Sequence, residues 1–111
     1  MNSRISLIIS FILVAFPISA MAGGDPGNLA EVGILKFKFE PQVITIKAGD
    51  TVRWINNEKR QYHSVWFEAL GEPEAPYFFP GEKFERTFNN PGEFPYRCGP
   101  HPKMTGTVIV E

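Results

Sequence analysis

Apolar and polar residues alternate with a period of two along much of this chain, which is typical of strands that bury one face. In the segment 35–40, leucine and phenylalanine alternate with lysine and glutamate, so we expect a strand there with a buried apolar face. The same reasoning predicts further short strands, over 43–47, 51–55, 63–67, 83–88, 94–98 and 106–110. Turn residues separate these segments, and no long stretch has helical periodicity. The pattern therefore predicts an all-β protein with one antiparallel β-sandwich domain.

The first 22 residues have the pattern of a secretory signal peptide. Arg4 precedes an apolar run over 5–16, and Ala20-Met21-Ala22 stands where a signal peptidase would cleave before Gly23. The apolar run is shorter than the roughly 20 residues that span a bilayer, so cleavage is favoured over retention as a membrane anchor. We expect a signal peptide over 1–22, a single domain over 23–111 and a periplasmic protein with no stable membrane insertion.

Charge and cysteine content limit the possible partners of the chain and the environment of its thiol. The chain has 11 basic and 12 acidic residues, a formal net charge of −1 and no basic tract, which argues against nucleic acid as a partner. Cys98 is the single cysteine, although small exported domains often carry cysteine pairs. A lone thiol in an oxidising compartment is expected to be either buried or bound to a metal.

The chemistry of the chain concentrates in one short segment near its C-terminus. Cys98, His101 and Met104 follow one another at intervals of three residues, and Pro100 and Pro102 exclude a regular helix between them. The three side chains must therefore belong to a tight loop between two strands.

The only other histidine, His63, lies in a separate expected strand. One thiolate, two imidazoles and a thioether are the ligand set of a blue-copper site. Together they predict one copper ion per chain that cycles between Cu(I) and Cu(II).

Other interpretations of these residues fit less well. A structural zinc site takes four Cys or His ligands, and a catalytic Cys–His pair lacks an orienting group and leaves Met104 unexplained. Met104 taken alone would more often be a core residue, and His63 alone a surface residue. Both histidines are used by one site whose ligands are all from the protein, so electron transfer fits and enzyme activity does not. A periplasmic protein that stores or delivers copper is the main alternative.

With these residues in place, the sequence resembles the cupredoxins, and within them the amicyanin and plastocyanin group. The segment 98–104 is similar to the short Cys-x-Pro-His-Pro-x-Met loop of amicyanins, and the resemblance extends over 48–56, 91–98 and 106–111. It implies a two-sheet Greek-key β-sandwich and a soluble periplasmic electron shuttle. It also implies that His63, Cys98 and His101 are the strong copper ligands and Met104 the weak axial one.

Two positions depart from the family pattern. Ser64 stands where relatives usually carry asparagine, so we expect the ligands to be held less firmly. Lys103 stands where amicyanins tend to have a bulky apolar residue, and it predicts, with neighbouring Arg97, Lys59 and Arg60, attraction of an acidic partner. The expected partners of this monomer are transient redox proteins: a c-type cytochrome, a dehydrogenase, a reductase or an oxidase.

Overall fold

Seven strands and one turn of 3₁₀ helix make up the ordered elements of residues 27–111, the part of the chain that the computed structural model describes. The elements are β1 (Leu29–Leu35), β2 (Lys38–Glu40), β3 (Val43–Ile46), β4 (Asp50–Asn56), the 3₁₀ helix η2 (Glu68–Leu70), β5 (Lys83–Phe88), β6 (Gly92–Arg97) and β7 (Thr105–Val110). Within these residues, no helix has the length and apolar character needed to cross a membrane. The expected signal peptide over 1–22 lies outside the described residues.

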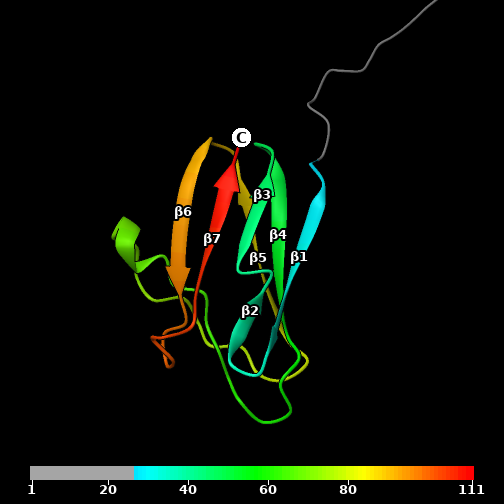
Figure 1. Cartoon of the computed structure of the whole chain (residues 1–111), viewed down its shortest axis with the longest axis vertical. Helices are drawn as coiled ribbons and strands as arrows, with labels where there is room; N and C mark the ends of the chain where they lie inside the picture. Colours follow the sequence, from blue (N-terminus) through cyan, green and yellow to red (C-terminus); the bar gives the residue numbers. More distant parts are fainter. Residues whose placement is uncertain (1–26) are drawn as a thin grey trace, which may run out of the picture.

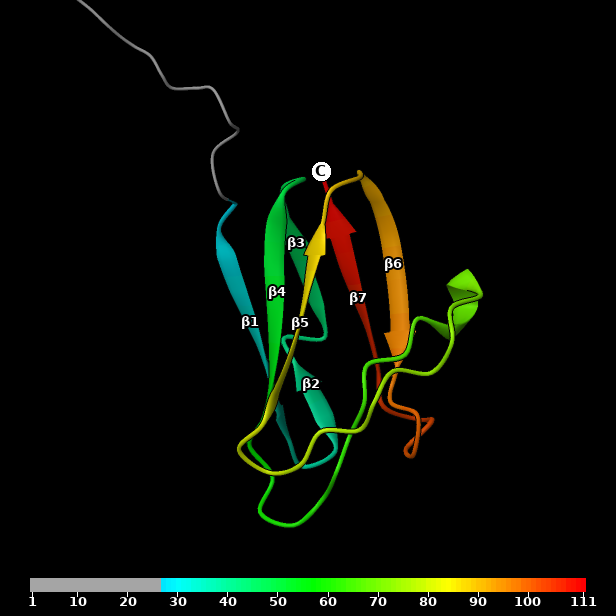
Figure 2. The ribbon, with the colours of Figure 1, turned by 180° about the vertical axis from the view of Figure 1, so that it is seen from behind.

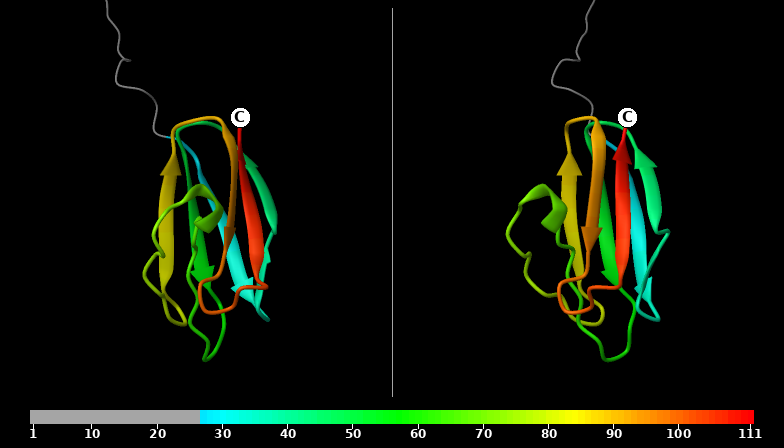
Figure 3. Two further views of the ribbon diagram at one scale, coloured as in Figure 1. Left: turned by 90° about the vertical axis from the view of Figure 1, so that its left-hand side faces the viewer. Right: turned by 60° about the vertical axis from the view of Figure 1, so that its left-hand side comes forward.

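The strands form two sheets that pack face to face (Figures 1 and 3). One sheet has the order β2-β1-β4-β5 and the other has the order β3-β7-β6. Alternate side chains of both sheets fill the space between them, among them the buried residues Val52, Trp54, Tyr96 and Val108. The expected all-β, two-sheet Greek-key sandwich is confirmed.

Two of the strand pairs are parallel, which corrects the expectation of a purely antiparallel sandwich. β1 pairs with β4, and β3 pairs with β7, in parallel. The chain runs past Pro41 from β2 in one sheet to β3 in the other, and then turns at 48–49. Because the chain changes sheet before it turns, β4 returns beside β1 in the same direction (Figure 2).

The segment 35–40 is a hairpin rather than one continuous strand. Lys36 and Phe37, with φ angles of 55° and 58°, form a two-residue turn between β1 and β2. Only Phe39 of the three expected core residues is buried, whereas Leu35 is 48% and Phe37 is 46% exposed. The prediction was wrong here because the turn reverses the chain in the middle of the apolar alternation.

The segment 63–67 is also not a regular strand. It makes two isolated bridges, one between His63 and Phe78 and one between Trp66 and Arg97. The N-terminal part of β1 was not predicted, although Val32 and Ile34 are buried at alternate positions. These differences matter for function, because 36–37 and 63–67 both contribute to the site described next.

Candidate metal centre

The connections that carry the predicted ligands lie at the end of the sandwich opposite the C-terminus (Figures 1 and 2). The 98–104 loop joins β6 to β7 at this end, and the β1–β2 turn and the segment between β4 and His63 reach the same end. Residues far apart in the sequence therefore meet where three connections converge.

Three of the four predicted ligands come together as one cluster. The ligand atoms of His63, Cys98 and His101 all lie within 4.8 Å of one another. The Nδ1 atoms of the two imidazoles are each 3.5 Å from Cys98 Sγ. His63 and Cys98 are fully buried, whereas His101 is partly exposed. One soft sulfur and two imidazole nitrogens converging on one point fit a copper ion.

Backbone hydrogen bonds give the 98–104 loop its shape. Cys98 N donates to Met104 O at 2.9 Å, and Met104 N donates to His101 O at 2.9 Å. The loop is therefore closed at its base and tightened by a turn ahead of Met104. Met104 itself is 5% exposed and directly precedes β7, three residues after His101 in the chain.

Ser64 joins the two ligand segments in spite of its short side chain. Gly99 N donates to Ser64 Oγ at 2.9 Å, and Ser64 N points to Cys98 Sγ at 3.4 Å. Ser64 is fully buried, and its bond to Cys98 Sγ is buried with it, whereas the bond from Gly99 N is partly buried. A side chain at position 99 would run into this hydroxyl and into the Glu74 carboxylate, which explains the glycine there.

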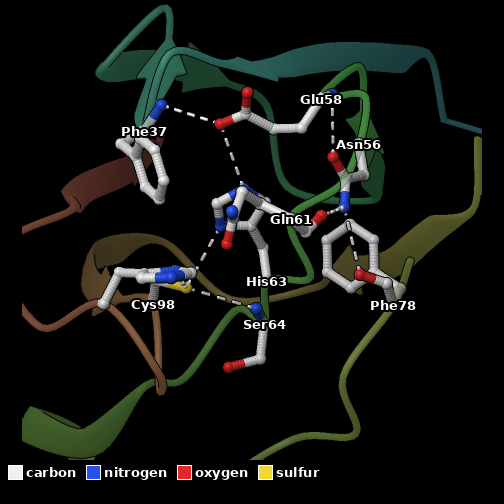
Figure 4. Close-up of polar contacts among 9 residues, drawn as sticks. Phe37, Asn56, Glu58, Gln61, His63, Ser64, Phe78 and Cys98 are labelled. Atoms are coloured by element: carbon white, nitrogen blue, oxygen red, sulfur yellow. Dashed lines mark hydrogen bonds and ion pairs between the residues drawn. The ribbon is translucent and has the colours of Figure 1, made fainter. Parts of the chain in front are cut away.

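The sequence reasoning missed Glu58, which contacts the outer nitrogen of His63. Glu58 Oε2 lies 3.3 Å from His63 Nε2 and also accepts a hydrogen bond from Phe37 N at 2.8 Å (Figure 4). A carboxylate on the outer nitrogen of a histidine fixes its tautomer and its ring orientation. This contact places the imidazole proton on Nε2 and leaves the Nδ1 lone pair facing Cys98. Glu58 stands in a polar connection without a periodic pattern, so no feature of the sequence identified it.

Asn56 holds the segment that carries Glu58. Its amide nitrogen donates to Gln61 O at 2.8 Å and to Phe78 O at 3.1 Å, and its Oδ1 accepts from Glu58 N at 2.9 Å. The side chain is fully buried, and Figure 4 shows it between these partners. A sequence signal did exist: Asn56 occupies the same buried face of β4 as Val52 and Trp54, and a polar residue there needs partners.

Burial and hydrogen bonds together set the pKa values of these groups. Two causes lower the pKa of His63: burial is the larger and repulsion from the nearby His101 is the smaller. This imidazole is therefore neutral at physiological pH. Burial alone would raise the pKa of Glu58, but the backbone N–H groups of Phe37 and Lys36 outweigh it, and the net pKa is lowered. Burial raises the pKa of the Cys98 thiol. A metal that binds here must therefore displace the thiol proton.

His101 lies at the surface beside aromatic and proline residues. Its ring centroid is 5.0 Å from that of Phe37 and 6.2 Å from that of Tyr62. A shallow hollow of about 390 Å³ lies over it, lined by Phe37, Pro100, His101, Pro102, Lys103 and Met104. Of the three clustered residues, His101 is the one that another molecule can approach.

Comparison with known proteins identifies relatives for this fold and site. The family described as copper binding proteins, plastocyanin/azurin family, matches residues 28–111. The amicyanin of Paracoccus versutus is 38% identical over 96 residues, which cover 81% of this chain and 70% of that protein. Amicyanin-alpha of Methylorubrum extorquens is 38% identical over 90 residues, which cover 78% of this chain and 75% of that protein. The crystal structure of the Paracoccus versutus amicyanin has a TM-score of 0.68 and 35% identity, and the match covers 78% of this chain and 85% of that chain.

A two-sheet sandwich with a His–Cys–His cluster at one end defines a cupredoxin, a class of copper-binding protein. This chain belongs to the plastocyanin/azurin family of copper-binding proteins. The resemblance inferred from the loop motif is thereby confirmed, and so is copper as the cofactor that the three clustered donors fit.

Proposed function

We propose that this chain is an exported one-electron carrier in which His63, Cys98, His101 and Met104 would hold a single copper ion, Met104 the most weakly. The observation that carries the proposal is the placement of both imidazole Nδ1 atoms 3.5 Å from a fully buried thiol. The proposal includes the signal peptide over 1–22, the mature domain over 23–111 and a periplasmic location.

The protein residues supply a fixed frame for the metal. Bound copper supplies a one-electron couple between Cu(I) and Cu(II). His63 is held through Glu58, and Cys98 is held through Ser64 N and the closed base of its loop. Ligands anchored in this way change position little when the charge at the site changes, which favours rapid electron transfer. The partly exposed His101 is then the surface end of the electron path.

The contacts expected for this function are brief encounters between redox proteins. The hollow over His101 is small and bordered by apolar side chains, as suits a weak interface of on the order of 1,200 Å² or less. A c-type cytochrome, a dehydrogenase, a reductase or an oxidase would each be consistent with a monomeric carrier of this kind. Because protein groups provide all four proposed ligands, no position is reserved for a substrate, and we propose no enzymatic activity.

Charges at this end of the sandwich support an acidic partner. Four exposed basic side chains form no ion pair within residues 27–111: Lys36, Lys59, Arg60 and Lys103. Arg97, which was expected to act with Lys59, Arg60 and Lys103, instead pairs with Glu68 and donates to backbone carbonyl groups. Long-range attraction by unpaired charges raises association rates at low salt. With the physiological partner, Lys103→Glu should weaken the salt dependence of the association rate; an unchanged dependence would refute this role.

Reversible redox cycling with metal retention tests the proposed carrier. We would load residues 23–111 with one equivalent of Cu(II), reduce with ascorbate, reoxidise, and measure the copper that passes an ultrafiltration membrane after each step. A carrier keeps its copper in both states, and its visible absorption bleaches and returns. Loss of copper on reduction would instead support a protein that stores or delivers the metal.

A further inference from the structure

The β1–β2 turn has a sequence that is poorly suited to its conformation. Both central residues have positive φ angles, which asparagine and glycine adopt at the lowest cost in such turns. This turn has Lys36 and Phe37 instead. Residues in such strained conformations persist where the surrounding structure fixes them, and they concentrate at functional sites.

A carboxylate fixes this turn to the metal centre. Glu58 Oε2 accepts the hydrogen bond from Phe37 N at 2.8 Å and lies 3.3 Å from His63 Nε2 (Figure 4). The Glu58 side chain is only 10% exposed, so water competes little for these bonds. The same oxygen therefore contacts both the turn and the buried histidine of the cluster.

The turn directs the Phe37 ring toward both imidazoles. The ring centroid lies 5.9 Å from that of His63 and 5.0 Å from that of His101, with interplanar angles of 78° and 81°. These are edge-to-face contacts, the arrangement that aromatic rings prefer. Phe37 is 46% exposed, so burial of its own surface does not account for its position.

His101 depends on such packing more than His63 does. His63 has a carboxylate on its outer nitrogen, whereas within residues 27–111 the His101 ring makes one polar contact, to Cys98 Sγ. Its orientation is therefore set by the rings around it, and Phe37 has the closest ring centroid after that of His63.

We propose that Phe37 is a positioning residue of the metal centre, which holds the His101 imidazole toward Cys98 and depends on Glu58 for its own conformation. This inference rests on the proposed function, since it takes His101 to be a copper ligand. It assigns to the strained turn a role in keeping the metal bound.

The test compares Phe37→Ala with a matched surface variant and a conservative one. Phe79 is 53% exposed and stacks on Tyr62, with no ring contact to either histidine, so Phe79→Ala is the control. Transfer of Cu(I) from the reduced protein to a chelator is timed by stopped flow. Phe37→Ala should lose Cu(I) on the order of tenfold faster than the unsubstituted protein. Phe37→Tyr keeps an aromatic ring at this position and should lose Cu(I) as slowly as the unsubstituted protein. Phe79→Ala should stay within about twofold, as expected for a surface substitution.

An NMR measurement and a replacement variant complete the test of Phe37. In the metal-free protein, nuclear Overhauser effects between the Phe37 ring and both imidazoles should be present, and their absence would overturn the inference. If Phe37→Ala does not fold, Phe37→Gly replaces it, because glycine adopts the left-handed conformation without strain, and the same faster loss is expected.

Equal rates of Cu(I) loss in the unsubstituted and ring-deleted proteins would overturn the inference while leaving the carrier intact. Failure of the unsubstituted protein to hold copper at all would overturn both.

Discussion

Asn56 is the residue whose removal should most damage the support of the site without touching a proposed ligand. Its side chain makes three hydrogen bonds, of 2.8, 3.1 and 2.9 Å, inside the protein. Asn56→Ala removes all three and leaves Gln61 O and Glu58 N without this partner. Each buried bond contributes about 1 kcal/mol net, so we expect a loss of about 3 kcal/mol in the free energy of unfolding. That is a large share of the total stability of a small domain.

Urea unfolding of the metal-free protein, followed by tryptophan fluorescence, measures this loss. The exposed Asn90 makes no side-chain hydrogen bond within the described residues, so Asn90→Ala is the control and should change stability by about 0.5 kcal/mol or less. Asn56→Asp keeps the acceptor for Glu58 N but places an oxygen against two carbonyl oxygens, and it should destabilise at least as much as Asn56→Ala. A loss below about 1 kcal/mol for Asn56→Ala would show that the three hydrogen bonds together contribute less than one ordinary buried bond, contrary to this prediction.

The remaining predictions concern pH and the 98–104 loop. Backbone N–H groups of Lys47 and Asn28 lower the pKa of Asp50, so its stabilising effect is complete above pH of about 4 and is lost as the pH falls through the lowered folded pKa. Acid titration of the unfolding free energy should show this loss, which Asp50→Asn should remove; identical profiles would contradict it. Gly99→Ala should lower the copper affinity about tenfold, because the new methyl group displaces the Ser64 hydroxyl from its bond to Gly99 N. An unchanged copper affinity in a competition titration would contradict this prediction.

Sequence reasoning succeeded where side-chain periodicity and local chemistry act together. In β4, apolar residues alternate and the structure buries Val52 and Trp54 as that pattern predicts. The prolines around His101 required a loop, and a loop between two strands is what the chain forms. Both features are determined by residues close together in the sequence, so they could be predicted from the sequence alone.

It failed where a contact distant in the sequence overrides the local pattern. The alternation over 35–40 is a good strand pattern, but the hydrogen bond from Phe37 N to Glu58 and the ring contacts with His63 and His101 stabilise a turn there instead. Glu58 could not have been recognised because its partners are 21 and 5 residues away and no spacing rule connects them. Such conflicts between local pattern and final structure are expected at functional sites.

Ser64 shows the same limit. A serine in place of asparagine suggested ligands that are held less firmly, yet its hydroxyl and its backbone N–H each reach the segment 98–99. How the substitution affects the metal geometry stays a prediction, which electron paramagnetic resonance of the copper-loaded Ser64→Asn variant would test.

Titration of the metal-free protein with Cu(II) shows whether the buried thiolate and the two imidazoles bind copper. We expect an intense visible thiolate-to-copper band that grows linearly, saturates at one equivalent and is absent from Cys98→Ser. A band that persists in Cys98→Ser, or a titration without saturation at one equivalent, would contradict this expectation.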